Sequence, residues 1–547
     1  MTQSMSSEQQ EKERRKRASR PKVRTGCVTC KTRHKKCDEG RPSCSMCTSS
    51  GRKCQYIETP DRRTRAARMG DKVVRVSRNS LPSGETGPAG NFLDGQLGPT
   101  AHLVYTGQVD LTPDERWYLD FFRKSTSLQC AGYFYDEFWQ RLVHQVSEVQ
   151  PAVCHAVIGM GSLNYRFVQL RKGESQGPLD RSFSLQQCNK AIACLRQNLM
   201  DNRLGRLRVE IALITCIVLV SIILFQEDAE SAGRHLRSGY KLLGEYLRDD
   251  AHRSSTSRAV AQAFAGIHLV WSTFTNPDSF TENEDRTFPF FVPKALPETV
   301  DNIEKAGNFL VILARMVLRR HPRGFSVGPA SSDLGGEPYA VLSKLRVWRS
   351  QIKGSLILHN DRLSQRDLDT LTLLEIWSEI LYIILFVENG PLPRETRYDE
   401  YLPRFQKAVE LAKKLLASDS SQNPLPAFSV NMGVIPPLFF CVFKCRDWLV
   451  RQEALLLLRQ WQRQEGIWST CATALVLKRV IEIETDGLTP EDLIPEESRI
   501  DSINVEITPD DPSLCLRYRR SHGQEVTAWA SEWLPYESAK NGDIGMW

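Results

Sequence analysis

The sequence predicts a small metal-stabilised module, a flexible linker and then a large all-α domain. Three observations support this prediction. Six of the 15 cysteines lie between Cys27 and Cys54, and residues 58–105 are rich in proline and glycine. From about residue 106, apolar residues recur at three- and four-residue spacing, which is typical of amphipathic helices. The composition, 41% hydrophobic and 25% charged, excludes collagen and wholesale disorder.

Charge is concentrated at the N-terminus. Residues 1–80 contain 22 Lys and Arg and 8 Asp and Glu, a net charge of +14, whereas the other 467 residues carry −7. A basic end on an acidic body predicts a polyanionic partner for that end, most simply nucleic acid. The basic run within residues 1–26 fits a nuclear-import signal, a phosphate-contacting arm or a solvated tail.

The cysteines are expected to be reduced metal ligands. The first residues lack the apolar stretch of a secretory signal, so disulfides are not expected and clustered thiols indicate a metal. The longest uncharged apolar run, Ile211 to Phe225, has 15 residues. This is shorter than a bilayer span, so we expect a buried core helix and no membrane partner.

The clustered cysteines repeat one spacing twice. The unit C-x2-C-x6-C recurs 17 residues later, at Cys27, Cys30, Cys37, Cys44, Cys47 and Cys54. Zinc prefers four ligands in tetrahedral geometry. Two Zn²⁺ therefore need eight ligand positions, which six thiolates fill only if two sulfurs bridge both ions. The duplicated spacing makes Cys27 and Cys44 the natural bridging pair.

One alternative for the metal site stays open. A single four-cysteine zinc site would use the two C-x2-C pairs and leave Cys37 and Cys54 unused. In either case a segment of about 30 residues is too short to build an apolar core, so metal binding must drive its folding.

The first half of the repeat is the more basic half. Between its second and third cysteines stand Lys31, Arg33, His34, Lys35 and Lys36. The matching stretch of the second half, TSSGRK, holds only two basic residues. The first half therefore carries the predicted DNA contacts, together with Arg24 of the arm, because such side chains reach phosphates and guanine edges. Charge compensation for a cluster of net charge −2 is the alternative explanation.

The stretch GCVTCKTRHKKCDEGRPSCSMCTSSGRKC resembles the fungal Zn2Cys6 binuclear-cluster DNA-binding domain of transcription factors, over roughly residues 26–56. The resemblance includes the Cys37–Asp38 step and Pro42. It implies two Zn²⁺ with Cys27 and Cys44 shared, and a first helix docked in the major groove at CGG-like triplets. His34 stands where the family most often has a base-reading Lys. An imidazole donates fewer hydrogen bonds than an ammonium, so triplet preference would be relaxed or carried by Arg33.

The body predicts helices throughout. The expected helices are Pro113–Lys124, Tyr135–Val149, Leu185–Met200, Arg206–Glu230, His235–Arg248, Leu368–Val387, Arg404–Leu416, Arg446–Gln464 and Thr473–Glu484. Residues 115–164 and 433–470 resemble the opening and the end of the helical regulatory region that follows such clusters in filamentous fungi. The resemblance implies a role in regulation or dimer contact, not catalysis.

Other features of the body suggest structure more than chemistry. No catalytic motif is visible, so the chain is not expected to be an enzyme, although a small-molecule receptor remains an alternative. His155 is expected to be a satisfied core histidine, and Cys441 and Cys445 buried structural cysteines. Arg446, Asp447 and Arg451 are expected to form helix-surface or interhelix ion pairs. The acid-rich stretch Glu482–Asp511 reads either as an activation segment or as the ending of the helical region.

These observations favour a nuclear, zinc-dependent transcription factor that binds double-stranded DNA and regulates RNA polymerase II genes. An adaptor that has lost DNA specificity is a further hypothesis. The linker shows no heptads, so we expect either a monomer or a homodimer through the helical domain, with the transcription machinery or co-regulators as partners. The expected domains are a basic arm (1–26), the Zn2Cys6 domain (27–57), the linker (58–105), the all-α regulatory domain (106–500) and a C-terminal segment (501–547).

Overall fold

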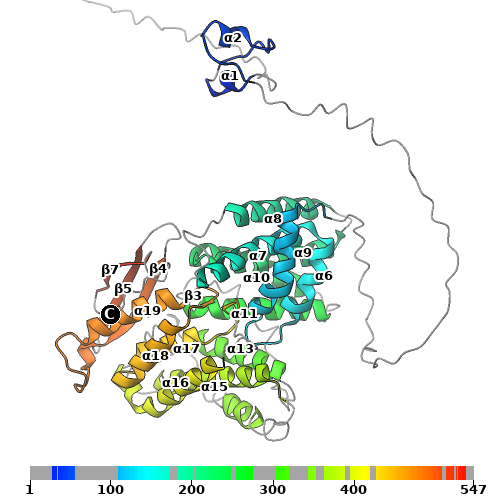
Figure 1. Cartoon of the computed structure of the whole chain (residues 1–547). Coiled ribbons are helices and arrows are strands. Elements are labelled where there is room, and N and C mark those ends of the chain that lie inside the picture. The colour runs from blue at the N-terminus through cyan, green and yellow to red at the C-terminus, as the bar shows by residue number, and fades with distance from the viewer. Residues whose placement is uncertain are drawn as a thin grey trace, which may run out of the picture. The chain divides into compact units, whose positions relative to one another are not determined.

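The structure is a computed structural model with two compact units, Met1–Leu97 and Gly98–Trp547 (Figure 1). It describes residues 27–33, 35–55, 109–172, 182–201, 204–247, 254–274, 303–319, 343–352, 363–388, 395–418, 427–507, 513–522, 525–526 and 528–536. The predicted basic arm and linker lie outside these residues. The predicted fold class is confirmed, with a cysteine cluster followed by a predominantly helical remainder. The boundaries of the five expected domains stay predictions.

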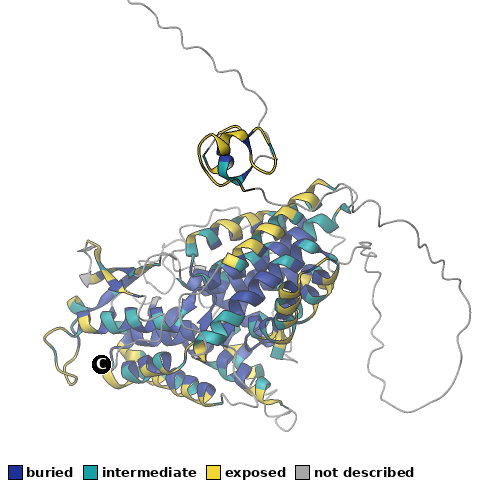
Figure 2. Cartoon of the chain, turned by 45° about the horizontal axis from the view of Figure 1, so that its top comes forward, coloured by how far each residue is buried: buried dark blue, intermediate teal, exposed yellow. Residues whose placement is uncertain are grey.

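The first unit contains two short helices, α1 (Val28–Thr32) and α2 (Ser45–Thr48). Among its described residues, the buried apolar side chains are all cysteines, at positions 27, 30, 37, 44 and 47. Figure 2 shows this small unit with a few buried positions surrounded by exposed backbone. The cysteines thus occupy the place that aliphatic side chains hold in a larger domain.

The second unit begins with helices that surround one apolar core. They are α4 (Pro113–Phe121), the π-helical turn η1 (Phe122–Thr126), α5 (Ser127–Cys130), the π-helical turn η2 (Phe138–Leu142), α6 (Val143–Val149), α7 (Pro151–Arg171), α8 (Ser182–Met200), α9 (Leu207–Phe225), α10 (Ala229–Leu247) and α11 (Ser255–Phe274). Thr112 and Glu115 form a capping box that fixes the start of α4. Figure 2 shows the buried residues gathered along the inner faces of these helices.

The later helices extend the same core. They are α13 (Ile303–Arg319), a helix at residues 343–352, α15 (Gln365–Glu388), the 3-10 helix η8 (Glu395–Tyr401), α16 (Leu402–Ala417), α17 (Ile435–Lys444), α18 (Trp448–Gln460), α19 (Thr470–Glu484) and the 3-10 turn η9 (Glu496–Ser498). By length and composition, α9 and the Gln365–Val387 part of α15 could each cross a membrane. Most of each apolar window is buried inside the protein, 67% and 72% respectively. The prediction of a core helix at residues 211–225 is therefore confirmed.

Two of the predicted helices have different bounds in the structure for local reasons. The expected helix Arg206–Glu230 is two helices, because α9 ends at Phe225 and Glu227 adopts a positive φ of 62°. The Asp228 carboxylate then accepts a hydrogen bond from the Ser231 N–H and starts α10. Likewise α18 begins at Trp448, because the Asp447 side chain caps it by accepting from the Val450 N–H at 2.9 Å.

The structure also contains strands, which the sequence analysis did not predict. Three two-residue strands, β1 (Phe428–Ser429), β2 (Gln464–Glu465) and β3 (Trp468–Ser469), form one small sheet. A second sheet comprises β4 (Ile500–Ile507), β5 (Ser513–His522), β6 (Glu525–Val526) and β7 (Ala530–Pro535). In it, β5 pairs antiparallel with β4, β6 and β7. Leu514 and Leu516 of β5 are fully buried and belong to the main core, so the sheet is part of the same packed unit.

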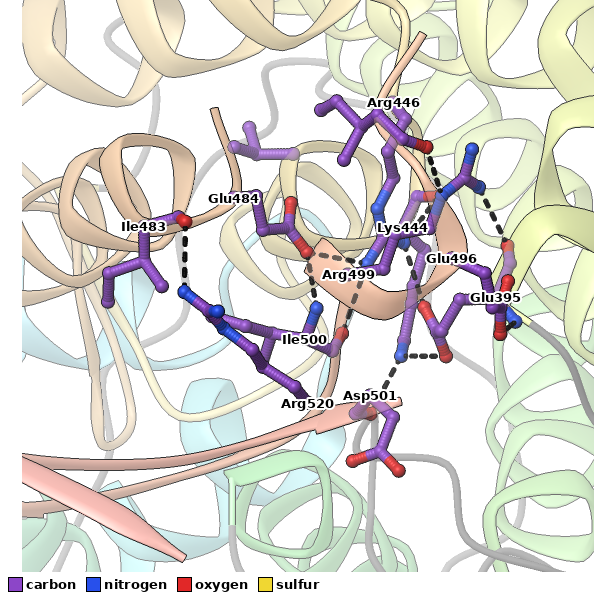
Figure 3. Close-up of polar contacts among 12 residues, drawn as sticks. Glu395, Lys444, Arg446, Ile483, Glu484, Glu496, Arg499, Ile500, Asp501 and Arg520 are labelled. Atoms are coloured by element: carbon purple, nitrogen blue, oxygen red, sulfur yellow. Dashed lines mark hydrogen bonds and ion pairs between the residues drawn. The ribbon is translucent and has the colours of Figure 1, made fainter. Parts of the chain in front are cut away.

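A buried network of ion pairs and hydrogen bonds joins this sheet to the helices (Figure 3). The Glu484 carboxylate, at the end of α19, pairs with Arg446 at 2.8 Å and with Arg451, and accepts the N–H of Ile500. Burial alone would raise the pKa of Glu484, but the two guanidinium charges outweigh it and hold the pKa at about 2. The expected interhelix ion pairs of Arg446 and Arg451 are thus present, whereas Asp447 is a helix cap.

The ion pairs continue toward β4. The Glu395 carboxylate pairs with Lys444 and Arg446 at 2.8 Å each, and the Lys444 ammonium also donates to the Asp501 carbonyl at 2.9 Å. Burial lowers the pKa of Lys444. Glu484, Glu496 and Asp501 all belong to the acid-rich stretch and all make contacts in this region. These engagements favour the interpretation of that stretch as the ending of the folded region.

Candidate metal centre and nucleic-acid interface

The six sulfur atoms of the first unit form two overlapping groups of four. One group is Cys27, Cys30, Cys37 and Cys44, and the other is Cys27, Cys44, Cys47 and Cys54. Within each group, all sulfurs lie within 4.8 Å of one another. Two residues, Cys27 and Cys44, therefore belong to both groups. In the described part of the chain these are the groups of His, Cys, Asp and Glu side chains arranged to hold a metal ion.

The spacing of the sulfurs fits tetrahedral zinc. A Zn–S bond of about 2.3 Å in a regular tetrahedron puts sulfur atoms about 3.8 Å apart. The Cys27 and Cys44 sulfurs are 3.6 Å apart, Cys30 and Cys44 are 3.6 Å apart, and Cys27 and Cys47 are 3.7 Å apart. The donor set therefore has the size that thiolate-bound zinc requires.

Backbone N–H groups point at the same sulfurs. The N–H groups of Cys27 and Glu39 donate to the Cys37 sulfur at 3.4 Å each, and the Cys44 N–H donates to the Cys54 sulfur at 3.3 Å. The Cys30 N–H donates to the Cys27 sulfur at 3.4 Å. Such bonds orient metal ligands and stabilise the thiolate form over the neutral thiol.

The thiols are electrostatically coupled. Desolvation opposes ionisation of Cys27, but hydrogen bonds to its sulfur, first from the Cys30 N–H, lower its pKa to about 6. Desolvation and the neighbouring Cys27 sulfur raise the pKa of Cys30 to about 12. Desolvation also raises the pKa of Cys44. Because the sulfurs lie close together, ionisation of one thiol opposes ionisation of its neighbours. A bound cation would stabilise all of them as thiolates.

Short-range contacts fix the return of the chain to the second half. The Asp38 carboxylate accepts the N–H of Ser45 at 3.0 Å at the start of α2, and this bond lowers the pKa of Asp38. The turn between them contains a cis Arg41–Pro42 peptide bond. The sequence resemblance includes Asp38 and Pro42, but it did not predict that Asp38 accepts the Ser45 N–H. The only sequence signal for this bond is a serine seven residues after the Cys-Asp step.

The two halves of the cluster also contact each other. The Val28 N–H donates to the Gln55 carbonyl at 2.7 Å, and the Thr29 hydroxyl donates to the Lys53 carbonyl at 2.9 Å. The Arg33 guanidinium donates to the Ser50 hydroxyl at 3.0 Å. Ser50 therefore positions a predicted DNA-contacting side chain, and no pattern in the sequence pointed to it.

The predicted DNA contacts are described only in part. Lys35 and Lys36 follow α1 and are exposed, whereas Arg33 is half-buried. Lys31 lies in α1, and its side chain is not described. Arg24 and His34 lie outside the described residues. In the second half, Arg52 and Lys53 are also exposed.

The other side chains weighed from the sequence have structural places. His155 bonds through Nδ1 to the Gln187 amide oxygen at 2.8 Å, so it is a satisfied histidine. Cys441 and Cys445 are buried, and burial raises the pKa of both thiols. These predictions are confirmed.

The chain is similar to known fungal proteins. The fungal Zn(2)-Cys(6) binuclear cluster domain matches residues 25–64. A protein of Emericella nidulans named an aspercryptin biosynthesis cluster-specific transcription regulator is 21% identical, over 82% of this chain and 85% of its own. Sterol uptake control protein 2 of Saccharomyces cerevisiae is 40% identical over 68 residues, 12% of this chain and 7% of its own.

A further fungal protein is also similar over a short segment only. The C6 finger domain transcription factor hasF of Aspergillus fumigatus is 39% identical over 66 residues, 12% of this chain and 8% of its own. This match and the yeast one therefore span under a tenth of the relative's length. No solved structure matches the chain. The chain thus carries a fungal Zn(2)-Cys(6) binuclear cluster domain, which supports binding of zinc and DNA, and it is similar to fungal transcription regulators.

Proposed function

We propose that the first unit holds two Zn²⁺ ions, bridged by Cys27 and Cys44. The observation that carries this proposal is the pair of overlapping four-sulfur groups that share these two residues. Each of the six cysteines then serves as a ligand. Two Zn²⁺ and six thiolates have a net charge of −2, which the nearby basic side chains offset. A single four-cysteine site would leave Cys37 and Cys54 without a metal. The sulfur of each accepts a backbone N–H, as expected for an oriented metal ligand, and this favours two ions.

We infer that the first half of the cluster contacts the major groove of DNA at CGG-like triplets. Lys35 and Lys36 are exposed directly after α1, where they can reach phosphates. Arg33 can read a guanine edge bidentately if it exchanges its single bond with Ser50 for bonds to the base. Arg24, Lys31 and His34 complete the proposed contacts from their places in the sequence. With His34 at the usual lysine position, Arg33 carries most of the base preference.

The similarity to transcription regulators and the division into two units support a wider proposal. The chain acts in the nucleus as a regulator of RNA polymerase II genes and has no catalytic role. The basic arm and linker add phosphate contacts on either side of the cluster. The helical body joins co-regulators or a second copy of the chain, since the linker sequence has no heptads to support a coiled coil.

The test is a selection from a pool of randomised DNA duplexes with the full-length, zinc-loaded protein at moderate salt. Enrichment of a CGG-like triplet is expected. Enrichment should fall with Arg33→Ala, and the control Arg52→Ala in the second half should leave it unchanged. Zinc loading without any sequence enrichment would contradict the proposal and favour an adaptor role. Enrichment of a different triplet would overturn the CGG assignment alone.

A further inference from the structure

A cavity of about 310 Å³ lies in the helical body, among the helix at residues 343–352, α15 and α16. In Figure 1, α15 and α16 run side by side. Part of the lining is apolar and comes from Trp348, Ile352, Leu368, Leu371, Leu411 and Leu415. The volume is at the lower end of the range for ligand pockets, so it suits a small molecule with an apolar body.

Three charged side chains that line the cavity are already engaged. Arg349 donates to the Glu379 carboxylate at 2.7 Å, and the Glu375 carboxylate pairs with Lys407 at 2.5 Å. The Asp369 carboxylate is buried and accepts hydrogen bonds from Gln365 at 2.9 Å and from the Ser418 hydroxyl at 3.0 Å. These contacts hold the three helices together and are not available to a ligand without being broken.

Lys414 differs from these three. It lies on α16 one turn before Ser418, and it is an exposed residue of the cavity lining. Its ammonium makes no hydrogen bond or ion pair with any residue that the structure describes. The adjacent Lys413, by contrast, pairs with Glu453 of α18 at 2.6 Å. Among the charged side chains of the described lining, Lys414 is thus the one left for a ligand.

We propose that this cavity binds a small monocarboxylate with an apolar body. The carboxylate pairs with the Lys414 ammonium, and the body packs against Trp348 and the leucines. The negative charge of Asp369 inside the cavity disfavours the opposite orientation, in which the acid would be desolvated beside another carboxylate. This site lies wholly in the second unit and does not depend on DNA binding by the first.

Binding of 4-phenylbutyrate to the full-length protein tests the proposal, with the neutral 4-phenylbutanamide as the matched ligand. Titration calorimetry is expected to show binding of the acid and at least tenfold weaker binding of the amide. Lys414→Ala should weaken binding of the acid by about tenfold, because a charge-assisted hydrogen bond is lost. Lys413→Ala is the control and should leave the affinity unchanged.

A second variant tests the place of binding. Leu368→Trp fills the cavity from a partly exposed position on α15, so it should abolish binding without changing the thermal unfolding midpoint. The proposal is overturned if neither probe binds, if the acid and the amide bind equally, or if Lys414→Ala and Leu368→Trp both leave the affinity of the acid unchanged.

Discussion

The two units of the chain are stabilised in different ways. In the described part of the first unit, the buried apolar side chains are cysteines, so the sulfurs need a metal ion to hold them together. The second unit buries a continuous apolar core and adds fully buried ion pairs around Glu484. The comparison shows how one chain combines a fold that depends on metal with a fold that depends on side-chain packing. Each can therefore be perturbed without the other.

Metal removal should give the largest effect. A strong chelator is expected to unfold the first unit and abolish DNA binding, because structural zinc supplies roughly 10–16 kcal/mol of folding free energy. The second unit should be unaffected. All 11 tryptophans lie between Trp117 and Trp547, so tryptophan fluorescence reports on the second unit alone. A chelator-induced shift of the fluorescence-detected unfolding midpoint would contradict the separation of the two units.

Loss of a buried charge should give the next largest effect. Glu484→Ala leaves the buried Arg446 and Arg451 without this carboxylate, and should lower the free energy of unfolding by about 3–5 kcal/mol. Denaturant unfolding followed by tryptophan fluorescence measures this change. Glu453→Ala is the matched control and should change stability little, because its ion pair with Lys413 is exposed. An equal loss of unfolding free energy in the two variants would show that the buried ion pairs contribute no more to stability than the exposed one.

The same carboxylate predicts an acid-dependent loss of stability. Its pKa is about 2 in the folded protein and about 4.3 in an unfolded chain, so the stabilisation is complete above the unfolded value. It should be lost as the pH falls from about 5 to about 2. Unfolding curves of the second unit across this range should be less pH-dependent in Glu484→Gln than in the parent protein. An identical pH dependence would show that Glu484 does not titrate as described.

A change at the DNA contacts should have the smallest effect and leave both folds intact. Lys36→Ala should weaken binding to all DNA sequences similarly and reduce the salt dependence of log K by about 1, because one phosphate contact is lost. Binding at several salt concentrations measures this slope. Lys53→Ala, in the second half of the cluster, should change the slope less. The reverse order would assign the DNA-facing side to the second half.

The sequence predicted the features that depend on local spacing. The repeated C-x2-C-x6-C unit located the sulfurs, and the apolar spacing located most of the helices in the body. The contacts that join distant segments were out of reach. Glu484 pairs with Arg446 and Arg451, which lie more than 30 residues earlier in the sequence. No pattern in either segment indicates that these side chains pair.

The C-terminal sheet was missed for a different reason. Leu514, Leu516 and Tyr518 occupy every second position of β5, which is a strand pattern. This alternation covers only part of β5 and follows an acid-rich stretch, so it is a weak signal for a strand. The break after Phe225 depends on the positive φ of Glu227 and on the Asp228 cap, and apolar spacing reports neither of these.

The zinc content of purified full-length protein tests the central claim most directly, with Cys37→Ser as the deciding variant. Elemental analysis should give two zinc ions per chain for the parent protein. Cys37→Ser should retain fewer, because Cys37 belongs to one of the two four-sulfur groups. Cys44→Ser should lose both ions, because Cys44 belongs to both groups. One zinc ion in the parent, unchanged by Cys37→Ser, would contradict the two-metal cluster and favour a single four-cysteine site.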